Sequence, residues 1–353
     1  MAGQVFLIWS VGFCLGSFMA SRMLRKHRLS GIFISACLTA SLSVYGMSVT
    51  TCFAIFAILY GVTGISGGML FTTSHTCLSD YFPAKRKSAL SFADFSFSTG
   101  MLSAPLMINW ILLHNHSWPC VYLYVTGANI TLALLIITAR LLPLWPQDSV
   151  RAPSQINTAH YLNSQYVQKK PTISLIVFYS TLCFSTGFIE WQQNVWLVTY
   201  LLNAGLSHTS ANKIISLFSI GMMLRRGMVA IGFLNSFKRK FFLDDLMFIT
   251  GMVALIFSKD TIFLSTGSCL AGFALGAVLP EVMATVMALI PSQAPVLSAV
   301  AIISLTSGGL FSGVYTGVVA SYFSYQTAYA GGLFVCMLII ITKRLIFSYA
   351  RDD

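Results

Sequence analysis

The residues best suited to chemistry are charged side chains that lie inside long apolar stretches. Glu190 is the first of these, within the segment Gly187–Ser207. Carboxylates and amides hydrogen-bond to hydroxyl groups, and indole rings pack on the apolar faces of sugar rings. This combination suits the binding of a sugar or polyol, although a helix turns only about half of these side chains toward one cavity. The alternative role for Glu190 is a hydrogen bond between helices. Its polar and aromatic neighbours are Trp191, Gln192, Gln193, Asn194 and Trp196, and those predicted to bind the solute together with Glu190 are Trp191, Gln193, Asn194 and Trp196.

Four further ionisable residues lie in apolar stretches, namely Asp94, Arg225, Arg226 and Glu281. Such groups are costly inside lipid, so they usually face the protein interior and mark ion or solute pathways. Glu281 follows Pro280, which removes a backbone N–H and can break a helix, and we expect Glu281 to take up protons or to pair with Arg226. We expect Asp94 to act in gating or to bridge to a basic loop residue. We expect Arg225 and Arg226 to pair with these acids or to bind an anionic solute. A further alternative for Arg226 is that its side chain extends to the cytoplasmic face.

The composition is that of a membrane protein. Of the 353 residues, 56% are apolar and only 9% are charged, whereas soluble domains carry about 25% charged residues. The eight cysteines are dispersed, without a C-x-x-C pair, and suit buried packing positions. The sequence therefore predicts no cofactor and no metal site.

Eleven segments are long and apolar enough to cross a bilayer, which requires about 20 residues. The chain is thus predicted to be an all-α membrane protein. The predicted spans are 3–22, 30–47, 50–78, 88–113, 118–141, 172–203, 208–234, 241–258, 261–289, 294–322 and 325–347.

The basic residues predict the topology. All but four of the 21 Lys and Arg residues lie on alternate loops, in the clusters 22–28, 85–87, 140–170, 238–240 and 343–351. Basic residues stay on the cytoplasmic side, so these loops and the C-terminus are predicted to be cytoplasmic. The net charge of +11 is explained by this topology, and nucleic acid is not an expected partner.

An internal repeat predicts two related halves, a common design among transporters. Segments 60–68 and 271–277, and segments 98–105 and 307–314, match at a separation of about 210 residues. We expect an N-terminal half at 1–142 with five spans, a cytoplasmic linker at 143–171 and a C-terminal half at 172–353 with six. By this repeat we expect twelve helices, of which the first is missing from the N-terminal half.

Two six-helix halves with a cytoplasmic linker resemble the major facilitator superfamily. Its loop signature is matched by Gly16 and Arg25–Lys26, with Ala20 where the family has an acid. The segment "GFIEWQQNVWLVTYLLNAGLS", with Arg225–Arg226 and Pro280, resembles the fucose, galactose and glucose:proton symporter subfamily. The resemblance implies a two-half helical bundle that works by alternating access.

The sequence thus predicts a secondary transporter of a small solute such as a sugar or polyol, coupled to protons and acting as a monomer in the cell inner membrane. Its predicted partners are the solute, protons and the lipid bilayer. The alternative is a truncated or non-transporting relative, such as a sensor, because the fourth-helix equivalent at 54–79 carries no acid. An enzyme is not expected, because no convincing His/Asn set or acid pair lies at a membrane face.

Overall fold

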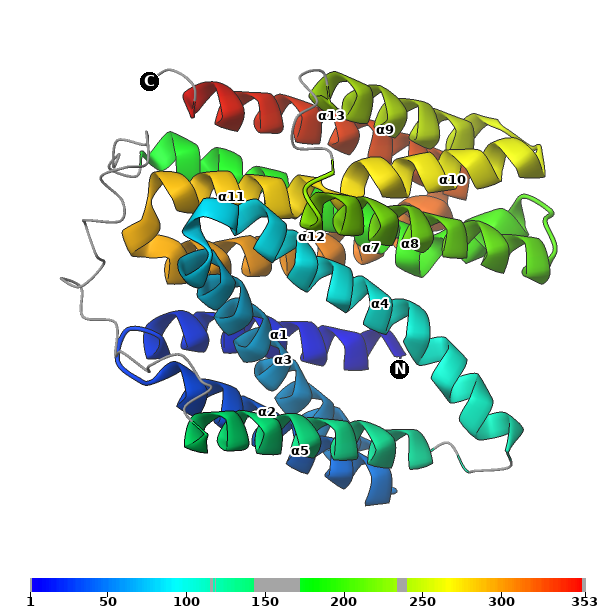
Figure 1. The fold of residues 1–353 in the computed structure, drawn as a ribbon. Coiled ribbons are helices and arrows are strands. Elements are labelled where there is room, and N and C mark those ends of the chain that lie inside the picture. Colours follow the sequence, from blue (N-terminus) through cyan, green and yellow to red (C-terminus); the bar gives the residue numbers. More distant parts are fainter. Residues whose placement is uncertain (1, 115–116, 118, 143–171, 234–239, 351–353) are drawn as a thin grey trace. The chain divides into compact units, whose positions relative to one another are not determined.

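The computed structural model describes residues 2–114, 117, 119–142, 172–233 and 240–350 (Figure 1). All regular elements in these residues are helices. The first half of the sequence contains α1 Ala2–Met23, α2 Leu29–Val49, α3 Phe53–Tyr81, α4 Arg86–Leu113 and α5 Cys120–Leu141. The second half contains α7 Ile173–Asn203, α8 His208–Ala230, α9 Lys240–Phe257, α10 Thr261–Gly276, α11 Val278–Leu289, α12 Ala294–Tyr322 and α13 Tyr325–Tyr349.

These helices confirm the eleven predicted spans, because α10 and α11 together form one span that is interrupted at Ala277. Within the described residues, seven spans are long and apolar enough to cross a membrane. Among the others, α4, α8 and α9 each carry three charged residues. The chain is a multi-pass, all-α membrane protein.

The chain divides into two compact units that do not follow the sequence halves. Unit 1 comprises residues 1–80, 104–167 and 291–303, and unit 2 comprises residues 81–103, 168–290 and 304–353. Helices α4 and α12 each contribute to both units. The predicted linker at 143–171 lies outside the described residues, and the division into halves at that linker stays a prediction.

In unit 1, α2 and α5 lie side by side, and α3 crosses α1 (Figure 1). The crossing is close because glycines form it. A Cβ atom on Gly64 or Gly68 would overlap the backbone carbonyl oxygens of Trp9 and Phe13 respectively. Small residues let membrane helices approach at backbone distance, as the glycine-rich sequence of α3 predicts.

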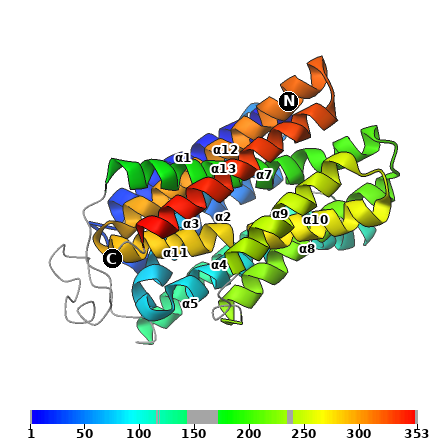
Figure 2. The ribbon, with the colours of Figure 1, turned by 90° about the horizontal axis from the view of Figure 1, so that it is seen from above.

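In unit 2, α8, α9 and α10 lie side by side, and α13 lies along α7 (Figure 2). The backbones of α8 and α10 are in contact, since a Cβ on Gly272 would overlap the carbonyl oxygen of Phe218. Helices α7, α8, α10 and α13 begin at side-chain caps that satisfy free backbone N–H groups. Asp260 Oδ1 accepts from the amide of Ile262 at 2.7 Å at the start of α10.

Candidate functional site

Glu190 lies in the middle of α7, and its side chain is buried within unit 2. The residue is 7% exposed. Helix α7 packs directly on the part of α12 in this unit, because Gly187 and Gly308 bring the two backbones together. This packing fixes the position of Glu190, which follows Gly187 by less than one turn.

Arg226 of α8 is the cation nearest to Glu190. Its Nη2 atom lies 3.7 Å from Glu190 Oε2, its Nη1 atom donates to Ser98 Oγ of α4 at 2.5 Å, and the residue is 4% exposed. Arg226 is thus buried inside unit 2 and is not exposed at the surface of that unit. A guanidinium presents donors in several directions, so this side chain can link several helices at once.

The third contact of Arg226 is made with a helix break. Its Nε atom donates to the carbonyl oxygen of Gly276 at 3.3 Å, at the end of α10. In a continuous helix that carbonyl would accept from residue 280, but Pro280 has no N–H. Arg226 therefore satisfies a buried backbone carbonyl that Pro280 leaves available, and the break that the sequence predicts at Pro280 is confirmed.

The other candidate binding residues on α7 point in different directions. Gln193 is fully buried and donates from Nε2 to Met252 Sδ of α9 at 3.6 Å. Asn194 donates to the backbone carbonyl of Glu190 at 2.9 Å. Trp191 lies against Gly309 of α12, and Trp196 lies near Gly317 of the same helix. The structure therefore places Glu190 beside α8, Gln193 beside α9 and the two indoles beside α12.

Gln192, which the sequence analysis did not select for binding, is fully buried. Its Nε2 atom donates to Thr316 Oγ1 at 3.1 Å and to the carbonyl of Ala328 at 3.3 Å. Its Oε1 atom accepts no hydrogen bond from the described residues. An amide at mid-helix in an apolar span was the available signal, but the sequence does not show which neighbouring helix it faces.

The neighbouring arginine makes a separate ion pair. Arg225 Nη2 lies 2.6 Å from Asp244 Oδ2 of α9, and the guanidinium lies over the ring of Phe273 of α10 at 5.2 Å. Arg225 is only 2% exposed. Adjacent residues point about 100° apart around a helix, which is why Arg225 and Arg226 have different partners.

Glu281 of α11 is paired with a lysine from the first half of the sequence. Its Oε1 atom lies 2.6 Å from Lys87 Nζ of α4. The sequence analysis gave pairing with Arg226 as one role for Glu281, but the carboxylate beside Arg226 is Glu190. Proton uptake by Glu281 stays a prediction. Asp94 is buried on α4 one turn before Ser98, and its backbone carbonyl accepts from Ser98 Oγ at 2.8 Å.

The sequence analysis overlooked two acids on α9, Asp244 and Asp245. Asp245 is buried and pairs with Lys343 and, at 3.0 Å, with Arg344 of α13. Two consecutive acids in an apolar span were the available signal. Their partners are a full helix or more away in sequence, so the pairing itself is not visible there.

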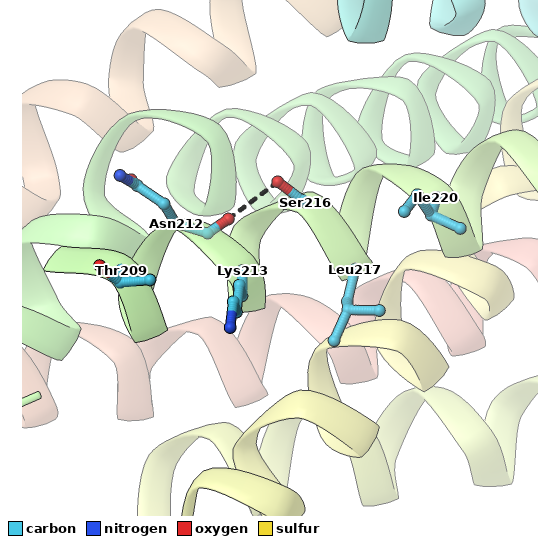
Figure 3. A pocket seen from close by; sticks show the side chains of 6 residues that line it. All are labelled: Thr209, Asn212, Lys213, Ser216, Leu217 and Ile220. Atoms are coloured by element: carbon cyan, nitrogen blue, oxygen red, sulfur yellow. Dashed lines mark hydrogen bonds between the residues drawn. The ribbon is translucent and has the colours of Figure 1, made fainter. Parts of the chain in front are cut away.

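A hollow lies along the exposed face of α8 (Figure 3). It has a volume of about 610 Å³, and the side chains that line it recur every three or four residues. They form one stripe of the helix. The lining residues are Thr209, Asn212, Lys213, Ser216, Leu217 and Ile220.

Known proteins resemble this chain in sequence and in fold. Over 162 residues it is 28% identical to the inner membrane transport protein YdiN of Escherichia coli (strain K12). This matching region makes up 46% of this chain and 36% of YdiN. The match thus spans about a third of that relative's length.

The fold matches that of the Escherichia coli fucose:proton symporter FucP with a TM-score of 0.74 and 12% identity, over 98% of this chain and 90% of FucP. FucP in the outward conformation gives a TM-score of 0.77 at 14% identity, over 98% of this chain and 89% of FucP. The human organic anion transporter MFSD10 (TETRAN) gives a TM-score of 0.76 at 15% identity, over 97% of this chain and 83% of MFSD10.

The family model that matches this sequence covers most of the chain, from residue 1 to residue 257. The helical spans, the helix break and the buried charges of unit 2 therefore belong to a member of the Major Facilitator Superfamily.

Proposed function

We propose that the protein is a secondary transporter that moves a small polar solute across the cell inner membrane by alternating access, driven by protons. The observation that carries this proposal is the set of contacts made by Arg226. One guanidinium joins a titratable carboxylate, Glu190, to Ser98 of α4 and to the helix break at Gly276. The superfamily and the symporter fold of FucP support the same conclusion.

In this proposal Glu190 carries the proton. A buried carboxylate and a buried guanidinium are each costly without a partner, so protonation of Glu190 removes the charge that Arg226 balances. Arg226 then relies on Ser98 and Gly276, which lie on α4 and at the α10–α11 break. The protonation state of one residue thereby changes the interactions among four helical segments, as a coupled conformational change requires.

The solute is proposed to bind beside α7, where Trp191 and Asn194 are only partly buried. An indole and an amide there can contact the apolar face and the hydroxyl groups of a sugar or polyol. Gln193 and Trp196 of the same helix support this position through their contacts with α9 and α12. The topology proposed from the basic loops places the C-terminus in the cytoplasm.

Uptake under an imposed proton gradient tests the proposal. Vesicles that contain the full chain are given labelled hexoses, 6-deoxyhexoses and the sugar acids galacturonate and gluconate, and wild type is compared with Glu190→Gln. The matched control is Asp260→Asn, an exposed carboxylate whose capping role asparagine can replace. We expect gradient-driven uptake in wild type and control, and its loss in Glu190→Gln. Equal gradient-driven uptake by all three proteins would exclude Glu190 as the proton carrier. No uptake by folded wild type would favour the non-transporting alternative.

A further inference from the structure

We infer that the transported solute is an organic anion that also carries hydroxyl groups, and that Lys213 of α8 binds its anionic group. This inference deepens the proposed transport function and rests on it. The site is the hollow along α8 (Figure 3).

The face of α8 that lines the hollow carries an ammonium group, an amide and two hydroxyl groups beside the apolar Leu217 and Ile220, although α8 is a membrane helix. Asn212, Lys213 and Ser216 are exposed in unit 2, whereas Ile214 and Phe218 are buried on the side toward α10. Polar and charged side chains on a spanning helix are costly against lipid and usually face a water-filled cavity. The stripe through the hollow is therefore placed on an aqueous path.

Lys213 is the charged group of this stripe. No carboxylate of the described residues pairs with it, since the interior acids Glu190, Asp244 and Glu281 already have basic partners. The first turn of α8 contains no acid, and its N-cap is the hydroxyl of Ser207. No acid in that turn therefore offsets the charge of Lys213.

Hydrogen-bonding groups lie on the same stripe of α8 as this charge. Ser216 Oγ donates to the backbone carbonyl of Asn212 at 2.8 Å, which leaves the lone pairs of the hydroxyl oxygen for another donor. The side chains of Asn212 and Thr209 are exposed beside it. An ammonium group with an amide and two hydroxyls within one hollow is suited to a carboxylate or phosphate that is attached to a hydroxylated chain. The volume of about 610 Å³ accommodates a small molecule of this kind.

Binding to the purified full chain tests the inference with matched pairs of probes. Galacturonate is compared with galactose, and gluconate with sorbitol, in vesicles of phosphatidylcholine alone. We expect the acids to raise the midpoint of thermal unfolding and the neutral partners to raise it less. Lys213→Gln should weaken acid binding by about tenfold or more, and Lys213→Arg should retain it. Lys259→Gln, which removes another exposed lysine, is the control and should bind like wild type.

Two results would overturn the inference. The first is equal binding of acids and neutral partners, or no binding of either acid, with no effect of Lys213→Gln. The second is a Lys213-dependent shift produced by phosphatidylglycerol in the vesicles but not by the sugar acids, which would make Lys213 a contact for lipid headgroups. Binding is measured without a proton gradient, so failure of the transport proposal in the uptake assay is a separate outcome.

Discussion

Arg226 and Gly276 are joined by a hydrogen bond from the guanidinium Nε to a backbone carbonyl that no helical N–H satisfies. The bond exists because Pro280 stands where the donor would be. A side chain on α8 thus stabilises the break between α10 and α11, and the same side chain contacts Glu190.

Replacing Pro280 with alanine should make the protein more stable and less active. Alanine restores the N–H, so α10 and α11 can join, and the Gly276 carbonyl no longer needs Arg226. Proline inside a helix costs about 3 kcal/mol, and part of this should return as a higher thermal unfolding midpoint. Gradient-driven uptake should fall, since Arg226 loses one of its three contacts. A variant with a raised midpoint and unchanged uptake would show that the break is not needed for transport.

The contact between α7 and α12 should tolerate no side chain at Gly308. A Cβ there would overlap the carbonyl oxygen of Phe184, which is backbone and cannot rotate away. Gly308→Ala should therefore lower the free energy of unfolding by about 1–3 kcal/mol, the usual cost of overpacking. Gly313→Ala is the matched control, because nothing lies within 4 Å of a Cβ at Gly313 on the same helix. Thermal unfolding in detergent measures both, and equal midpoints would contradict the close approach.

Much of the fold follows from the sequence because a bilayer requires long apolar helices. The predicted spans and the observed helices agree to within a few residues, and the break near Pro280 follows from its missing N–H. Which side chains meet depends instead on how each helix is rotated against its neighbours. For this reason the sequence identifies Glu190, Arg226 and Glu281 as interior charges but does not show that Glu281 pairs with Lys87.

The two buried arginine pairs should respond differently to paired substitution. Removal of one partner leaves a buried charge, so Arg225→Met or Arg226→Met alone should each cost about 3–5 kcal/mol of stability. Removal of both partners of a pair should recover most of the stability that the single substitution loses. We expect the double variant Arg225→Met with Asp244→Leu to keep gradient-driven uptake, because that ion pair only stabilises the packing of α8 on α9.

In contrast, Arg226→Met with Glu190→Leu should fold and fail to couple uptake to protons. Unfolding midpoints and uptake in the same vesicles measure the two effects separately. Loss of uptake in both double variants would assign Arg225 a part in transport. Retained coupling in the Arg226 double variant would contradict the proposed role of Glu190.

Cys52 tests the proposed topology through its chemistry. It lies exposed between α2 and α3, in a loop expected outside the cytoplasm. The backbone N–H groups of Ile55 and Ala54 lower the pKa of the Cys52 thiol, which favours the reactive thiolate. A membrane-impermeant maleimide should label right-side-out vesicles quickly at neutral pH. The rate should fall as the pH drops through the lowered pKa, below the range of an ordinary cysteine.

Cys52→Ser should abolish the rapid labelling, while the buried Cys336 should not react before unfolding. Inside-out vesicles should react only after they are permeabilised, since the bilayer then separates the reagent from Cys52. Rapid labelling of sealed inside-out vesicles, with none in right-side-out ones, would reverse the orientation. Lys213 and Cys52 would then both face the cytoplasm, and the solute would meet the α8 hollow from the opposite side of the membrane.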